Sequence, residues 1–110
     1  MNILDTLATH MEMTEAIRNY VHEKLLSLEK FCERYSPCEV SAEVGKTSEH
    51  HQKGKIFRAE FMMTIPGTTL RAEAIEEDLY AAIDIAKDEL KRQLIEHKER
   101  LDDKHKEDRG

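Results

Sequence analysis

The chain has 110 residues, a length typical of one domain with one modest hydrophobic core. Hydrophobic residues make up 39% of it and aromatic residues only 5%, so the core must be mostly aliphatic. No window approaches the roughly 18 apolar residues of a membrane-spanning helix. The first residues also lack the basic start and apolar run of a secretory signal. We therefore expect a cytoplasmic protein with no membrane partner.

The charge balance is acidic, with 23 acidic against 17 basic residues and a formal net charge of −6. Nucleic-acid-binding domains are usually basic, because Lys and Arg contacts to phosphates supply much of their affinity. Any binding to RNA would therefore have to depend on local clusters of basic residues rather than on the total charge.

The first half of the chain predicts a strand, a helix and a second strand. Residues 2–8 favour a strand, although Asp5 interrupts the alternation of apolar and polar side chains. Thr14 is a suitable N-cap for an amphipathic helix of about five turns. Pro37 ends that helix, because the residue before a proline is biased out of the helical conformation. Strict alternation then predicts a half-buried strand over 38–44.

The second half predicts a hairpin and a long helix. A polar loop over 45–54 leads into a strand over 57–65 with one apolar face. Pro66-Gly67 is a strong turn signal, so the strand around 70–74 should pair antiparallel with it. A final helix begins near Asp78 and carries one apolar stripe as far as Leu101.

The predicted order of elements is β-α-β-β-β-α. One-sided strands need a cover, and two one-sided helices supply it. We expect an α/β two-layer sandwich, in which a mixed four-stranded sheet carries both helices on one face and exposes the other. The domain would span 1–101, and the charged stretch 102–110 would be a tail that frays.

The residues indicate no enzyme. The chain contains no nucleophile-elbow, zinc-protease or Gly-rich phosphate motif, so we expect no catalytic residue, cofactor or small-molecule substrate. Cys32 and Cys38 lie on apolar sides of their elements and are interpreted as buried small hydrophobes. A zinc site that combines them with His50 and His51 is an alternative, although the spacing matches no common zinc pattern.

Basic residues gather in three places. In the final helix Lys87, Lys91 and Lys98 fall within about 40° of one another beside the apolar stripe, with Arg92 further toward solvent. His97 falls on the stripe itself, where a histidine is more often packed than functional. In the first helix Arg18, His22 and Lys30 are predicted to face outward, and Lys24 falls on the apolar side. The loop and its edges add Lys46, Lys53, Lys55 and Arg58.

Three stretches resemble the ribosome hibernation promoting factors, also called ribosome-associated inhibitors. Residues 77–100, EDLYAAIDIAKDELKRQLIEHKER, are similar to the family's signature helix. Residues 13–31 resemble its first helix, and residues 54–74 resemble its central hairpin. The family pattern is missing at Ser27 and Glu43, where relatives often carry a basic residue.

The resemblance implies a fold similar to a double-stranded-RNA-binding domain. It also implies binding to small-subunit ribosomal RNA in the channel for messenger and transfer RNA, with reversible silencing of translation under stress. The protein would be monomeric away from the ribosome. An alternative is a protein-interaction module of the same fold without ribosome binding, which the negative charge favours. The RNA-binding residues that carry over are Arg18, Lys24, Lys87, Lys91, Arg92 and Lys98.

Overall fold

The protein is a two-layer α/β sandwich. The computed structural model describes residues 1–47, 54 and 56–109, with side chains as far as Lys104 in the last helix. Its elements in chain order are β1 (Asn2–Thr9), α1 (Glu15–Leu26), α2 (Glu29–Cys32), β2 (Glu39–Lys46), β3 (Phe57–Ile65), β4 (Thr68–Glu76) and α3 (Leu79–Arg109).

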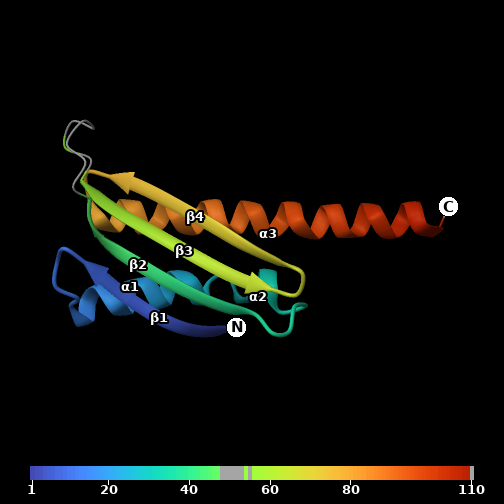
Figure 1. The fold of residues 1–110 in the computed structure, drawn as a ribbon, viewed down its shortest axis with the longest axis horizontal. Helices are drawn as coiled ribbons and strands as arrows, with labels where there is room; N and C mark the ends of the chain where they lie inside the picture. Colours follow the sequence, from blue (N-terminus) through green and yellow to red (C-terminus); the bar gives the residue numbers. More distant parts are fainter. Residues whose placement is uncertain (48–53, 55, 110) are drawn as a thin grey trace.

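One mixed sheet forms the first layer, with strand order β1-β2-β3-β4. β1 and β2 are parallel, and the other two pairs are antiparallel. All the helices lie on one face of this sheet, α1 and α2 behind β1 and β2 and α3 behind β3 and β4 (Figure 1). The predicted sandwich, including the mixed sheet and the helices on one side, is confirmed.

The core lies between the two layers. It consists of the alternate strand residues that were predicted to point inward, together with the apolar sides of α1 and α3. Phe61, Met63, Leu25, Leu90 and Ile83 are among its largest fully buried side chains. Its aliphatic character follows from the composition, because Phe61 is the only aromatic side chain among the buried residues of the described chain.

The pairing of β1 with β2 explains the broken alternation near Asp5. The register shifts between Ile3 and Thr6, as in a β-bulge, and this leaves Leu4 and Asp5 both exposed. At the other end of the pair, a Cβ on Gly45 would lie 2.1 Å from the carbonyl oxygen of Thr9. The two strands therefore approach too closely at this point for any side chain on β2.

The predicted hairpin is confirmed. Ile65 pairs with Thr68, so only Pro66 and Gly67 connect β3 to β4. Gly67 has a φ of +86°, a conformation that favours glycine. A type II turn requires a residue such as glycine at its second central position and often has proline at the first.

The first helix is shorter than predicted. α1 ends at Leu26, and α2 forms a separate turn that ends at Cys32. At the break, the amide of Leu28 donates to the carbonyl of Leu25 and that of Phe31 to Leu28, both three residues back. The tighter bonds change the direction of the chain while Leu28 and Cys32 stay buried.

The last helix is longer than predicted. α3 runs 31 residues to Arg109, through the stretch that was expected to fray. Residues 80–109 contain no glycine or proline and are rich in Lys, Arg, Glu and Leu, which are good helix formers. The C-terminal part of α3 projects beyond the sheet (Figure 1). The division into a domain over 1–101 and a tail over 102–110 stays a prediction.

No helix in the described part of the chain combines the length and the apolar character needed to cross a bilayer.

Candidate nucleic-acid interface

The candidate site lies where α1 and α2 face α3 on the outer side of the helical layer. α1 and α3 are joined by Tyr20, whose hydroxyl donates to a carboxylate oxygen of Asp84 at 2.6 Å. The ring of Tyr20 also packs edge-on against Tyr80, with 4.8 Å between the centroids. The hydrogen bond to the carboxylate, with burial and the negative charge of Asp84, raises the pKa of Tyr20 to about 12. A neutral Tyr20 therefore holds the two helices together.

Lys24 lies on the apolar side of α1, as predicted, and its surroundings explain why. Its ammonium nitrogen is 3.5 Å from Asp84 and 5.1 Å from the centroid of the Tyr20 ring. The side chain is 28% exposed, so the aliphatic stem packs between the helices while the charged end reaches the surface.

Further along, α2 and α3 enclose a groove of about 250 Å³. Phe31, Leu94 and Ile95 provide its apolar surface, and charged side chains surround that surface. The ammonium groups of Lys30 and Lys91 lie 5.2 and 5.0 Å from the centroid of the Phe31 ring. These are cation–π distances, so the aromatic ring holds two positive charges beside the groove. The full lining is Lys30, Phe31, Glu33, Arg34, Leu94, Ile95 and Lys98.

The cations of this face differ in whether an acid neutralises them. Within the described residues, Lys30, Lys91 and Lys98 form no ion pair, nor does the exposed Arg18. Lys87 pairs with its neighbour Asp88 at 2.6 Å. We call Lys30, Lys91 and Lys98 the lysine strip. Its three positive side chains come from α2 and α3 and have no ion-pair partner among the described residues.

Arg92 does not belong to this strip. It forms ion pairs with both Glu89 and Glu96 on its own helix. Gln93 donates to Glu89 and to the carbonyl of Arg71 in β4. The glutamates that pair with Arg92 therefore lie on the flank of α3 opposite the lysine strip. The hydrogen bonds from Arg92 and Gln93 lower the pKa of Glu89 to about 2, and the two acids raise the pKa of Arg92.

Sequence reasoning left several groove residues out of the candidate set. Lys30 was predicted to face outward but was not included, and Phe31, Arg34 and Ile95 were not considered as site residues. The four-residue spacing of Lys30 and Arg34 is a signal that was present in the sequence, because such residues share one helix face. Arg34 also lies 3.6 Å from Asp102 of α3, which links the two sides of the groove.

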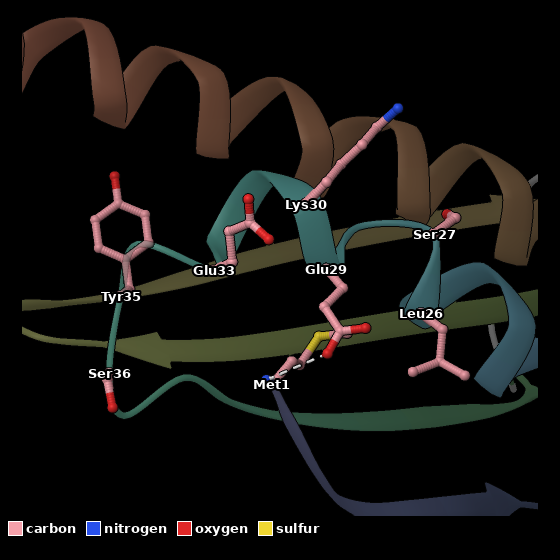
Figure 2. Close-up of a pocket in the computed structure, with 8 residues that line it drawn as sticks. All are labelled: Met1, Leu26, Ser27, Glu29, Lys30, Glu33, Tyr35 and Ser36. Atoms are coloured by element: carbon pink, nitrogen blue, oxygen red, sulfur yellow. Dashed lines mark ion pairs between the residues drawn. The ribbon is translucent and has the colours of Figure 1, made fainter.

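A larger hollow, about 750 Å³, lies beside the junction of α1 and α2. Figure 2 shows Glu29 turned toward Met1, with which it forms an ion pair, and Lys30 extending away toward α3. Glu33 also lines this hollow. Two carboxylates near its surface make it a poorer place for phosphate than the groove between α2 and α3.

The open face of the sheet carries a network of opposite charges. Arg58 pairs with Glu43, Glu60 and Glu73, and Arg71 also pairs with Glu60 and Glu73. Arg58 was counted among the basic residues around the loop, but it is neutralised here on the face away from the helices. Lys53 and Lys55 lie outside the described residues.

His22 and His97 both contact other side chains in the fold. His22 was predicted to face outward, which is wrong: it is half-buried, and its Nε2 lies 2.9 Å from the hydroxyl oxygen of Thr6 in β1. The register shift in β1 turns Thr6 inward beneath α1, and this creates a polar partner for the imidazole. His97 packs against the ring of Tyr35, with 5.7 Å between the centroids, as its position on the apolar stripe predicted.

Both cysteines are buried free thiols, as interpreted from the sequence. Burial raises the pKa of Cys38 to about 12, so the thiol is protonated and unreactive. His50 and His51, the other residues of the alternative zinc site, lie outside the described residues. Among the residues that are described, no cluster of three or more His, Cys, Asp or Glu could hold a metal ion.

Comparison with known proteins identifies a family. Residues 6–102 match the family described as "Sigma 54 modulation protein / S30EA ribosomal protein". The ribosome hibernation promoting factor of Azotobacter vinelandii is 37% identical over 90 residues, which cover 82% of this chain and 77% of the relative. The ribosome hibernation promotion factor of Deinococcus radiodurans is 34% identical over 100 residues, which cover 91% of this chain. The chain spans only about half, 51%, of the Deinococcus protein's length.

Two solved structures have the same fold as this chain. The crystal structure of the Thermus thermophilus Protein Y N-terminal domain has a TM-score of 0.65 and 40% identity, covering 86% of this chain and 96% of that one. A ribosomal subunit interface protein from Coxiella burnetii, 22% identical with a TM-score of 0.66, shares the fold over 89% of this chain and 98% of its own. The chain therefore belongs to the S30EA ribosomal protein family, the family of the ribosome hibernation promoting factors.

Proposed function

We propose that this protein is a hibernation factor that binds the small ribosomal subunit in the cytoplasm and reversibly silences translation under stress. The observation that carries the proposal is the lysine strip, three cations without an acidic partner in the described residues, beside an aromatic ring on one face of the helical layer. The family resemblance and the names of the relatives supply the target, because those proteins are called ribosome hibernation factors.

The mechanism is occupancy rather than catalysis. Lys and Arg side chains neutralise phosphates and position the domain, and the shape of the ribosomal cleft selects it. A domain held in the channel for messenger and transfer RNA blocks translation for as long as it stays bound. Its release requires only that the contacts to phosphate are broken, which makes the inhibition reversible.

The carried-over residues contribute unequally in this proposal. Lys91 and Lys98 contact phosphate directly, and Arg18 extends the same face along α1. Lys24 and Lys87 contribute less, because Asp84 and Asp88 already neutralise them. Arg92 lies outside the contact, since it is paired with two glutamates on the other flank of α3.

The negative total charge is compatible with this interface because the charges are separated in space. Salt screens electrostatic interactions beyond about 8–10 Å, so the lysine strip acts on nearby phosphates without much influence from the sheet face. The acids around Arg58 and Arg71 would in turn keep RNA away from that face. We infer that the protein binds RNA through its helices only.

Co-sedimentation with small subunits over a series of salt concentrations tests the proposal. The wild type should bind less as salt rises, because bound cations release counterions from the RNA. Replacing Lys91 and Lys98 together with Gln should weaken binding and reduce the slope against log salt by about 2, roughly one for each lost phosphate contact.

The matched control replaces Arg92 and Arg100 with Gln. Arg92 directly follows Lys91 and Arg100 lies two residues after Lys98, but both point to other sides of α3, so the same loss of charge should leave the slope nearly unchanged. Pelleting that does not depend on salt, or equal effects of the two double variants, would contradict the proposed interface.

A protein-interaction module of the same fold remains the second candidate. The observation that favours it is the open sheet face, where Leu7 is 57% and Met62 is 42% exposed between the charged residues. If the wild type shows no salt-sensitive binding to small subunits, this candidate is the better one.

A further inference from the structure

We propose that the groove between α2 and α3 holds one unpaired nucleotide of the bound RNA, with its base against the apolar surface and its phosphate at the lysine strip. This inference rests on the proposed function and names what that site recognises. It concerns a position with a defined chemistry, whereas the broader proposal requires only a positive face.

The groove presents an apolar surface to solvent, and this favours contact with a base. Ile95 is 38% exposed although it is a large hydrophobic residue, and Phe31 is only half-buried beside it. Leu94 also lines the groove and is itself buried. Contacts to phosphate do not require an apolar surface, whereas the binding of an unstacked base is stabilised by contact with an aromatic or aliphatic side chain.

The size and the opening of the groove are the second argument. Its volume of about 250 Å³ is below the roughly 300 Å³ at which pockets for drug-sized ligands begin. It can accept a flat group of the size of a base but not the stacked pairs of a duplex. In a paired helix the bases are also turned inward, so only an unpaired nucleotide can present one here.

The charges at the rim are the third argument. Lys30 and Lys98 reach the groove from α2 and α3 respectively, and the ammonium of Lys91 lies 5.0 Å from the centroid of the Phe31 ring that lines it. Arg34 contributes a further cation but is partly neutralised by Asp102, and Glu33 is the one acid that lines the groove among the described residues. The remaining excess is positive, which suits the phosphate attached to a base and disfavours a basic peptide.

One pair of variants isolates the contact with the base. Ile95→Ser removes apolar surface from the groove, and Ile85→Ser makes the same change at an isoleucine of α3 that is 46% exposed and does not line the groove. Ile95→Ser should weaken binding to small subunits about tenfold, or about 1.4 kcal/mol, with the salt slope unchanged, because no phosphate contact is lost. Ile85→Ser should bind like the wild type. Thermal unfolding checks that both variants remain folded.

Two further measurements locate the nucleotide. Ultraviolet cross-linking of the 110-residue chain on the small subunit should join RNA to the peptide that contains Phe31. The free protein is then titrated with a short single-stranded RNA and with a duplex of the same length, observing the methyl resonances of Ile95 and Ile85 by NMR. The single strand should shift Ile95 more than Ile85, and the duplex should not.

The outcomes separate the two proposals. If the wild type pellets with small subunits in a salt-sensitive manner while Ile95→Ser and Ile85→Ser behave alike, the nucleotide site is wrong and the interface stands. If the wild type does not pellet, the proposed function fails, and the titration still decides whether the groove takes an unpaired nucleotide. A cross-link from α2 to a ribosomal protein would contradict the nucleotide site and indicate that the groove binds a peptide instead.

Discussion

Asp84 is a carboxylate at the centre of the face that we propose to contact RNA, and its replacement by Asn should change stability and binding in opposite directions. Asp84 accepts a hydrogen bond from Tyr20 at 2.6 Å and lies 3.5 Å from the ammonium of Lys24. Both partners belong to α1. The carboxylate therefore stabilises the packing of the helices and at the same time neutralises a lysine that could otherwise bind phosphate.

The loss of stability can be worked out from these contacts. A hydrogen bond to a charged group contributes about 1.5–3 kcal/mol, against about 0.5–1.5 kcal/mol for a neutral pair, so Asn at position 84 should cost about 1 kcal/mol. The ion pair with Lys24 adds less than about 1 kcal/mol, because both side chains are partly exposed. For a domain of this size, a total near 1–1.5 kcal/mol lowers Tm by about 5–8 °C.

The affinity for small subunits should increase, although the stability decreases. Without Asp84, Lys24 is available to phosphate, so the Asp84→Asn variant should bind small subunits more tightly. Its slope against log salt should be steeper by about one contact. The matched control is Asp88→Asn, which releases Lys87 in the same way but does not touch Tyr20. That variant should also bind more tightly, while its stability changes by less than about 0.5 kcal/mol.

Three assays follow the two variants: thermal unfolding, co-sedimentation over a salt series, and spectrophotometric titration of the tyrosines. In the third, the pKa of Tyr20 should fall from about 12 toward 10 in Asp84→Asn only, because the carboxylate that raises it is gone. Weaker binding by a folded Asp84→Asn protein would refute the reasoning. It would mean that Asp84 holds Lys24 in position for RNA rather than competing with the RNA.

Three other substitutions test the fold. Gly45→Ala should lower the free energy of unfolding by about 2 kcal/mol or more in urea, because its Cβ would lie 2.1 Å from the carbonyl oxygen of Thr9 and force β1 away from β2. Leu90→Ala should cost about 2–5 kcal/mol in the same assay, since Leu90 is fully buried in the core. Arg92 lowers the pKa of Glu89 to about 2. The stability that this ion pair adds to the fold is therefore present above the ordinary pKa near 4.5 and is lost as the pH falls toward 2. The free energy of unfolding of the Glu89→Gln variant should depend less on pH in that range.

Most of the fold could be predicted because burial follows the local geometry of each element. The alternation in β2, β3 and β4 and the apolar stripe of α3 correctly identified the core-facing residues, since strand and helix periods alone decide which side chains share a face. The turn at Pro66 and Gly67 and the start of the final helix near Asp78 were equally local. In the structure the side chain of Asp78 accepts a hydrogen bond from the amide of Ala81.

The candidate site was predictable only in part. The spacing of Lys91 and Lys98 placed them on one flank of α3, but it could not show that Phe31 would hold Lys91 from a helix sixty residues earlier in the chain. The break in the first helix after Leu26 was also missed, because the apolar spacing continues through it. That break turns α2 and so sets the groove that Lys30 and Arg34 line.

By itself, then, the sequence determined the order of the strands and the two main helices, the inward faces of β2, β3, β4 and α3, and the family to which the chain belongs. Only the tertiary structure decided which positive side chains are neutralised: Arg92 by the glutamates on either side of it, Lys24 by Asp84 from another helix, and Lys98 by none of the described residues. The physical reason is that periodicity is a property of consecutive residues. Charge pairing depends on distances and side-chain directions that exist only once α1, α2 and α3 have packed on the sheet.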